Sequence, residues 1–363
     1  MGFKERDLLY KEIQKIRKRP TISYVTSIRP MYGGVMACDA ITEFCEQLQQ
    51  IPVKFKEVDL LLVSNGGDPI AAWRIMSLLR ERFENVGVLL PYQAFSAATL
   101  LAMGANEIIM HPFSNLGPVD IQLSYMHNGE KKNFGVEDLS HLFDFVKKDL
   151  GIVKEECLTS ILSLIHTDIG GLSIGAAKRS SNLSITLGQN LLKQHMDDLE
   201  KIESISQALN KSFYHHGYAV GREEAYNIGL PVILDNNKRL MDLIWAIWRD
   251  FEKEMECSKS FNPLEILLEH PEWRNYLNTV PIIQIPTNLP IEIKNEIYNQ
   301  IKSNIQIQLM EPVNYSPLQA AIESPWVRSE FRSTFQISAS KQADINIKMD
   351  VTQISSSWNT IIV

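Results

Sequence analysis

Ser96 is the residue in this sequence best placed for covalent chemistry. It stands in "LLPYQAFSAATLLAMGANEIIMHP", residues 89–112, where an apolar run ends at Pro91 and a run of small, helix-forming residues begins at Ala97. A serine between a strand and a helix presents its hydroxyl above the sheet, and the helix directs free N–H groups at a developing anion. The flanking motif is A-x-S-x-A rather than G-x-S-x-G, so a helix N-cap is the simpler alternative for this serine.

A Gly-Gly pair supplies a second element of such a site. Gly66 and Gly67 follow the buried run "VDLLLVSN" at 58–65. Acyl transfer needs two N–H donors directed at the tetrahedral oxyanion, and loss of one costs about 10²- to 10³-fold in rate. The N–H groups of Gly67 and Ala97 fit that role if both motifs lie at the same edge of a parallel sheet. Taken alone, a Gly-Gly pair after a strand is more often only a tight turn.

The segments around these motifs alternate between strand and helix patterns. Apolar or β-branched runs predict strands at 20–27, 58–65, 86–91 and 106–112. Helical spacing of apolar residues predicts helices at 37–51, after Gly67, over 137–165, over 172–212 with an interruption around "SSNLSIT", and from Leu240 to Phe251. Such alternation indicates a largely parallel sheet with helical crossovers.

Composition changes near residue 258. No glycine occurs after Gly229, and eight of the sixteen prolines lie between Pro263 and Pro325. The tail at 333–358 alternates between apolar and polar residues as strands do. We therefore expect one domain over 1–257 and a second, α+β domain over 258–363.

Charge and cysteine usage exclude several classes of function. A net charge of −7 argues against a nucleic-acid surface. The four cysteines contain no C-x-x-C pair, and no signal peptide is visible, so we expect reduced thiols in a cytoplasmic protein. No apolar run approaches the ~18 residues of a membrane span. The glycines at 170 and 175 lack the lysine of a phosphate loop, and the "HH" pair lacks metal-site spacing, so no cofactor or metal is expected.

Together the motifs resemble the serine dehydrogenase proteinase family, which belongs with signal peptide peptidase A in the Clp protease/crotonase fold. The resemblance extends through "LGPVD" at 116–120, "GGLSIGAAKRS" at 170–180 and "YHHGYAVGREEAYNIGLPV" at 214–232, and it covers roughly residues 10–235. It implies an α/β fold with a Clp protease/crotonase-like repeated β-β-α core, followed in this chain by the C-terminal α+β domain.

The resemblance also assigns roles to the site residues. It makes Ser96 the nucleophile and gives the oxyanion hole to Gly66, Gly67 and Ala97. "LGPVD" is similar to the loop that holds the catalytic histidine in Clp-type relatives, but this chain has a valine and Asp120 there. The usual Clp-type Ser-His-Asp triad is therefore absent, and Asp120 is left either to orient another base or to cap the next turn.

Two kinds of base are open for activating the serine hydroxyl. In signal peptide peptidase A the base is a lysine with a lowered pKa; Lys178 in "IGAAKRS" is the stronger candidate for that role here and Lys148 in "FVKKDLG" the weaker. The other solution is His216, because the family usually carries a histidine at that position. The "HHG" segment would bring His215 or His216 near the serine, unless the histidine only packs beneath its loop.

The resemblance implies a cytoplasmic serine endopeptidase that acts on peptides or unfolded proteins. Proteases of this fold usually form rings, so we expect a homo-oligomer with 137–165 as one contact, and a C-terminal domain able to recruit a partner ATPase or another protein. Two other functions stay open. Crotonase-type acyl-CoA chemistry uses a similar oxyanion hole but needs a carboxylate where Ser96 stands, and a non-catalytic oligomeric scaffold would act through the C-terminal domain.

Overall fold

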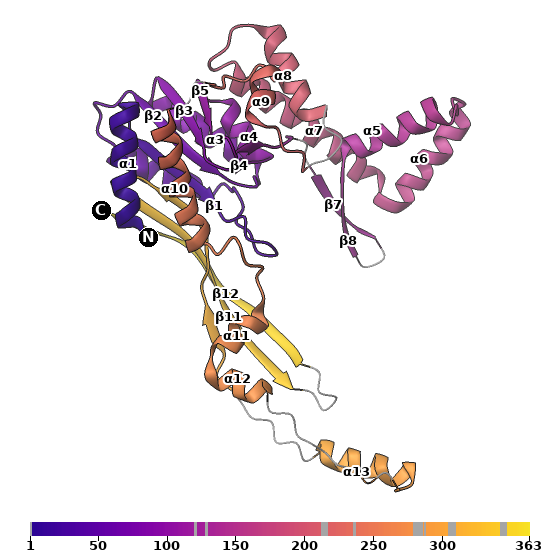
Figure 1. Ribbon diagram of the computed structural model, residues 1–363. Coiled ribbons are helices and arrows are strands. Elements are labelled where there is room, and N and C mark those ends of the chain that lie inside the picture. Colours follow the sequence, from indigo (N-terminus) through magenta and orange to yellow (C-terminus); the bar gives the residue numbers. More distant parts are fainter. Residues whose placement is uncertain are drawn as a thin grey trace.

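The computed structural model describes residues 2–119, 122–127, 130–211, 217–234, 237–278, 286, 288–303, 310–341 and 347–363. Figure 1 shows three parts: a body around one sheet, a helical lobe beside the body, and a long arm that extends from it. The body contains both motifs singled out in the sequence, so it is described first.

The sheet of the body has the strand order β12-β11-β10-β1-β2-β3-β5, with β9 paired to β11. Its parallel part consists of β1 (Thr21–Thr26), β2 (Glu57–Val63), β3 (Asn85–Leu90) and β5 (Glu107–Met110). These are the four strands predicted from the sequence, and they are confirmed. The antiparallel strand β10 (Leu318–Glu323) pairs with the free side of β1.

Helices cover both faces of this sheet, and the alternation of side chains along the strands explains why (Figure 1). Leu61 and Leu89 point to one face, where they pack with α1 (Phe3–Arg17) and α10 (Lys238–Glu254). Leu60 and Val88 point to the other face. That face carries α2 (Ala40–Gln50), α3 (Pro69–Arg82) and α4 (Ala97–Met103). Strands buried on both sides need continuous apolar runs, which this sequence has.

Short second strands give the core its repeated β-β-α pattern. β4 (Gln93–Ala94) follows β3, β6 (Asn115–Leu116) follows β5, and the two pair in parallel. Single bridges continue this layer from Ala94 to Ser64 and from Gly67 to Met36. The residues that follow the main strands are therefore gathered at the carboxyl edge of the sheet.

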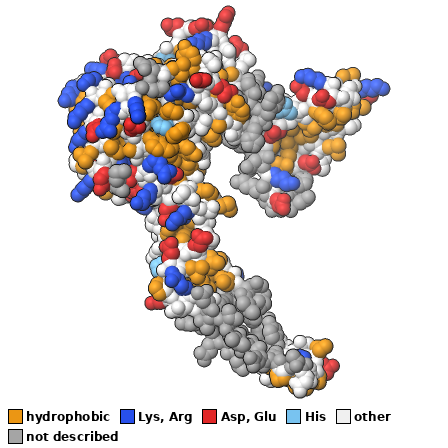
Figure 2. Space-filling view, viewed as in Figure 1, with side chains coloured by type: hydrophobic (Ala, Val, Ile, Leu, Met, Phe, Trp, Pro, Cys, Tyr) orange, Lys and Arg blue, Asp and Glu red, His pale blue; other side chains and the backbone are white. Residues whose placement is uncertain are grey.

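The lobe is helical, as predicted for 137–165. It contains α5 (Val136–Asp144), a π-helical turn (Phe145–Asp149), α6 (Glu155–Ile169) and the start of α7 (Gly171–Leu192), next to the hairpin of β7 (Gln122–His127) and β8 (Glu130–Gly135). No side chain of α6 is buried, and Figure 2 shows hydrophobic side chains gathered over the lobe. In the described part of the chain no single helix is long and apolar enough to cross a membrane, although α6 and α7, bent by 92°, pass that test together.

The predicted interruption around "SSNLSIT" is wrong. α7 runs through it without a break, and the chain leaves the helix only before α8 (Leu199–Lys211). The hydroxyl of Ser184 donates to Val119 O at 2.8 Å, and that of Thr186 to Asn182 O at 2.8 Å. These hydroxyls find acceptors in the loop beside the helix and in the helix itself, so they do not end it.

The arm is built by the C-terminal part of the chain. It contains α11 (Pro263–Glu269), α12 (Pro271–Asn278), α13 (Ile291–Ser303), β9 (Val313–Tyr315), and the outer ends of β11 (Val327–Lys341) and β12 (Ile347–Ile362). Leu267, Trp273 and Ile337 belong to a separate small core here. The predicted α+β composition is found, but strands from both sides of the predicted boundary at 257/258 share one sheet, because β10 is hydrogen-bonded to β1.

A buried ion cluster fastens β10 to the first helix. Arg6 Nε donates to Glu323 Oε1 at 2.6 Å, and the hydroxyl of Tyr10 donates to the same oxygen at 2.7 Å. Arg6 also pairs with Asp250 of α10. Arg6 and Glu323 are fully buried. Removing either charge would leave the other buried without a partner, so the cluster holds α1, α10 and β10 together.

A second ion cluster lies at the amino edge of the parallel strands. Arg17 donates to Asp59 Oδ2 at 2.8 Å and to Glu107 Oε1 at 2.6 Å, and Arg19 pairs with both carboxylates. A Cβ at Gly87 would lie 2.3 Å from Asp59 Oδ1, so the glycine leaves the room that the cluster occupies. Burial raises the pKa of Asp59 to about 6, and Arg17 opposes that rise.

Candidate active site

Ser96 lies at the turn between β4 and α4, with φ 54° and ψ −120°. A non-glycine residue at positive φ is strained, and such strain is held in place by the surrounding structure. Ser96 occupies the N-cap position, but its side chain makes no capping hydrogen bond. The N-cap alternative therefore does not explain this hydroxyl, which is half-exposed.

One backbone hydrogen bond and one buried threonine hold the turn. Ser96 N–H donates to Pro118 O at 3.1 Å. The Thr99 hydroxyl lies 2.7 Å from Ala94 O and 2.9 Å from Gly117 O, and it accepts from Gly117 N–H at 3.2 Å. Thr99 thus joins the segment before Ser96 to the "LGPVD" loop. The sequence analysis missed this residue, whose only signal is a hydroxyl inside an apolar helix.

The Gly-Gly pair lies directly against the serine turn, as predicted. A Cβ on Gly66 would lie 2.4 Å from Phe95 O and 2.9 Å from both Ala97 N and the Ser96 Cβ. Gly66 also has φ 93°, a conformation that favours glycine. Only a residue without a side chain lets the two motifs approach this closely.

The two glycines have different roles. Gly66 N–H donates to Ser64 Oγ at 2.9 Å, and that oxygen also accepts from the hydroxyl of Thr26 at 2.7 Å. Gly66 N–H is therefore occupied, and the prediction that Gly66 contributes a donor to the oxyanion hole needs correction. Gly67 φ is 151°, and a Cβ there would lie 2.2 Å from Met36 O.

The backbone N–H groups of Gly67 and Ala97 are the predicted donors of the oxyanion hole. Gly66 O and Asp68 N–H make the ladder with Met36, which leaves Gly67 N–H outside that ladder. Ala97 N–H opens α4, where the first N–H groups of a helix have no partner within it. Within the described ranges neither Gly67 N–H nor Ala97 N–H donates a hydrogen bond. An anion next to Ser96 Oγ would meet two free donors and the amino end of a helix.

The structure describes only part of the "LGPVD" loop and not all of the predicted site residues. Val119 is buried, its N–H donates to Leu209 O at 3.0 Å, and its carbonyl accepts from Ser184. The loop is therefore fixed up to that residue. Asp120, His215 and His216 lie outside the described residues.

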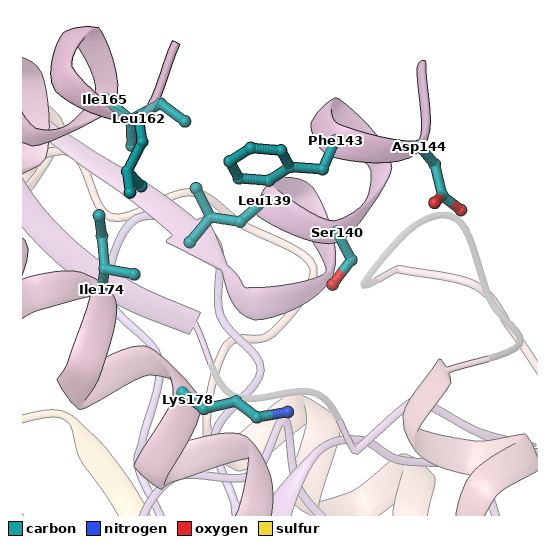
Figure 3. A pocket seen from close by; sticks show the side chains of 8 residues that line it. All are labelled: Leu139, Ser140, Phe143, Asp144, Leu162, Ile165, Ile174 and Lys178. Atoms are coloured by element: carbon teal, nitrogen blue, oxygen red, sulfur yellow. The ribbon is translucent and has the colours of Figure 1, made fainter. Parts of the chain in front are cut away.

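Both candidate lysines lie in the lobe, and both are exposed. Lys148 pairs with Asp144 at 2.7 Å, and that hydrogen bond raises its pKa. A lysine base needs burial that lowers its pKa, and Lys148 is exposed and ion-paired. Lys178 lines a hollow of about 430 Å³ with mostly apolar side chains from α5, α6 and α7, including Phe143 and Leu162 (Figure 3).

No metal centre accompanies this arrangement within the described ranges, which contain no group of three or more His, Cys, Asp or Glu side chains able to hold a metal ion. A strained serine between strand and helix lies against a Gly-Gly turn at the carboxyl edge of a parallel sheet. Such a strand-to-helix serine with nearby backbone N–H donors is typical of nucleophilic serine hydrolases.

Comparison with known proteins gives the family. Residues 13–259 match the model of the ClpP-like SDH-type serine proteinases, and the chain belongs to that family. The predicted family and fold are thereby confirmed. Two uncharacterized proteins of Methanocaldococcus jannaschii are each 31% identical to the chain, over 203 and 197 residues. The matched segments cover 56% and 52% of this chain but only 62% and 56% of those relatives.

Two solved structures of the 1510-N membrane-bound stomatin-specific protease are also similar. One is a serine-to-alanine variant, and the other is a lysine-to-alanine variant in complex with a substrate peptide. Their TM-scores are 0.38 and 0.36 at 16% and 17% identity, and the matches cover 60% of this chain and 83% and 78% of theirs.

Proposed function

We propose that this chain is a serine peptidase that hydrolyses peptide bonds through an acyl-enzyme on Ser96. The observation that carries the proposal is a strained Ser96 without a capping bond beside two donors, Gly67 N–H and Ala97 N–H, that make no hydrogen bond to any described residue. Membership of a serine proteinase family supports the same reaction class.

The reaction follows from this geometry. Ser96 Oγ attacks the carbonyl carbon of the scissile peptide bond while a base takes its proton. The carbonyl oxygen becomes an anion that accepts from Gly67 N–H and Ala97 N–H. The intermediate collapses, the C–N bond breaks, and the amine leaves with the proton returned by the base. A water molecule then hydrolyses the ester in the same two steps and frees Ser96.

His216 is the base in this proposal, with Asp120 orienting it. The support comes from the sequence, where the family usually places a histidine, and from the two lysines. Lys148 is ion-paired with a raised pKa, and Lys178 is exposed in the lobe. A Ser-Lys pair of the signal peptide peptidase A type would need one of them to be buried beside Ser96.

The remaining features of the proposal concern context. We place the enzyme in the cytoplasm, with peptides or unfolded proteins as substrates, and as a homo-oligomer that uses the α5–α6 lobe as one contact. The exposed apolar side chains of the lobe, Leu142, Phe145, Leu162 and Leu164, support that contact. The arm is the surface that we assign to a partner ATPase or another recruited protein.

The test is labelling of the purified protein with a fluorophosphonate, followed by intact mass. Wild type should gain one adduct, and Ser96→Ala should gain none. Gly175→Ala is a matched control, because a Cβ there would meet nothing within 4 Å. His216→Gln should slow the labelling of Ser96 by the fluorophosphonate, and Lys178→Met should not. An intact assembly that never labels would reject the peptidase and favour the non-catalytic scaffold.

A further inference from the structure

β12 is the outermost strand at one end of the strand order. On one side it pairs with β11 from Ile362 opposite Val327 to Ile347 opposite Lys341. No described strand pairs with its other side. At the usual rise of a strand, this edge is about 50 Å long. It presents a row of backbone N–H and C=O groups able to bind another strand.

The chemistry of this edge favours pairing. Residues 351–363 contain no charged side chain and no proline. Ile354, Ile361 and Ile362 are 53%, 53% and 61% exposed. Proteins usually protect sheet edges with lysine, proline or short strands. β12 has only a register irregularity at Ile354 and two charges near its start.

The edge is also held rigidly in its inner half. Trp358 Nε1 donates to Asp39 Oδ2 at 2.9 Å, and the ring of Trp358 packs against that of Phe331 at 5.4 Å between centroids. The Thr360 hydroxyl donates to Glu43 and lies 2.9 Å from the Ser329 hydroxyl, within hydrogen-bond distance. A strand fixed in this way loses little conformational freedom when it binds a partner.

We propose that β12 pairs antiparallel with β12 of a second copy of this chain across a two-fold axis. An antiparallel edge is complementary to itself, as a two-fold interface requires. Lys348 and Asp350 are the only charges of β12. If the two-fold axis crosses β12 after residue 350, Lys348 and Asp350 each lie opposite an uncharged residue of the second copy. No like charges then lie opposite each other. An axis near Ser355 pairs the whole strand and joins the two sheets.

This contact is separate from the proposed catalytic site and from the lobe. β12 lies at one end of the strand order, whereas β3 and β5, which lead to Ser96, lie at the other. The proposal therefore adds an interface to the proposed homo-oligomer. Its failure would leave fluorophosphonate labelling of Ser96 unchanged.

The experiment places like charges on both edges. Ser355→Glu with Ser357→Glu adds two carboxylates at exposed positions. Within one chain Ser357 lies opposite Arg332, which a glutamate suits, so the monomer should keep its fold. Across the axis the same carboxylates repel. Ser258→Glu with Ser260→Glu, at exposed positions outside β12, is the control of equal charge.

Two readouts decide the proposal. In sedimentation, the assembly formed by the Ser355→Glu/Ser357→Glu variant should have about half the mass of the wild-type assembly. The assembly formed by the control should have the wild-type mass. By hydrogen exchange, amides of 351–363 in wild type should be protected at high protein concentration and lose that protection on dilution. Asn359→Lys, which faces Glu330 within the chain, is a second variant with the opposite charge and the same expected result.

Three outcomes would overturn the proposal. One is an unchanged mass of both β12 variants together with exchange that does not depend on concentration. Another is a fall in mass of the control equal to that of the β12 variant. The third is protection that appears only when a reduced, carboxymethylated polypeptide is added, which would make the edge a binding site for unfolded chains instead.

Discussion

The two ends of the parallel strands differ in how their polar groups are partnered. At the amino edge, Asp59 and Glu107 share Arg17 and Arg19, and every one of these charges has a partner. At the carboxyl edge of the same strands, Ser96 Oγ and two N–H groups have none within the described ranges. At the amino edge the charged groups are all paired and contribute to stability. At the carboxyl edge the N–H donors stay available to bind an anion that forms during the reaction.

The largest effect is expected at the close approach of the two carboxyl-edge motifs. Gly66→Ala would place a Cβ 2.9 Å from Ala97 N and from the Ser96 Cβ. We expect peptidase activity and the rate of fluorophosphonate labelling to fall by about 10²-fold or more, because the donor and the nucleophile both move. Gly175→Ala, with open space around its Cβ, is the control. Equal labelling rates in the two variants would show that the approach does not matter.

A smaller effect is expected from the hydroxyl that positions the turn. Thr99→Val keeps the shape but removes the hydrogen bonds to Ala94 O and Gly117. The labelling rate should fall about tenfold, with stability reduced by about 1 to 2 kcal/mol. Thr99→Ser should restore the rate. A variant that loses stability but labels at the wild-type rate would reduce Thr99 to a purely structural role.

At the amino edge we expect a loss of stability without an effect on Ser96. Arg17→Met leaves Asp59 and Glu107 with one arginine fewer, at a cost of about 3 kcal/mol in urea unfolding. The folded variant should still label at the wild-type rate. Lys148→Met, which removes an exposed ion pair in the lobe, should change neither quantity. A slower labelling rate in Arg17→Met would show that the two edges are coupled.

The last effect is a pH dependence that belongs to the amino edge alone. The pKa of Asp59 is raised by burial from its ordinary 3.8 to about 6. The folded state therefore holds the proton more tightly, so this contribution is greatest below about pH 4 and declines, by on the order of 2 kcal/mol, as pH rises to about 6. Urea unfolding of wild type and Asp59→Asn across that interval should show the decline only in wild type. Parallel curves would contradict it.

The sequence predicts the parallel part of the sheet well because each strand is buried on both faces and is therefore rich in apolar and β-branched residues. Ser96 and the glycines were singled out because each follows a strand of the predicted parallel sheet, with Ser96 at a turn between strand and helix. The separate roles of Gly66 and Gly67 were not predictable, since they depend on the hydroxyl of Ser64, which is a contact in three dimensions.

Two other results depend on contacts far apart in the chain. The run "SSNLSIT" contains weak helix formers, but Ser184 is satisfied by the loop at Val119, so the helix continues. The place of β10 beside β1 could not be read from composition, which marks a change near residue 258 but not the partner of the strand that follows. Periodicity shows that a strand exists and leaves its neighbour unspecified.

The buried pair of Arg6 and Glu323 has a consequence for how the chain is made. The two residues are separated by 317 positions, and a ribosome adds about 5 to 20 residues per second, so Arg6 waits roughly 15 to 60 seconds for its partner. During that time β1, whose residues are all buried in the finished protein, has an open edge. We therefore expect that the open edge of β1 in the nascent chain must be protected from pairing with other strands until the C-terminal strands have been synthesised.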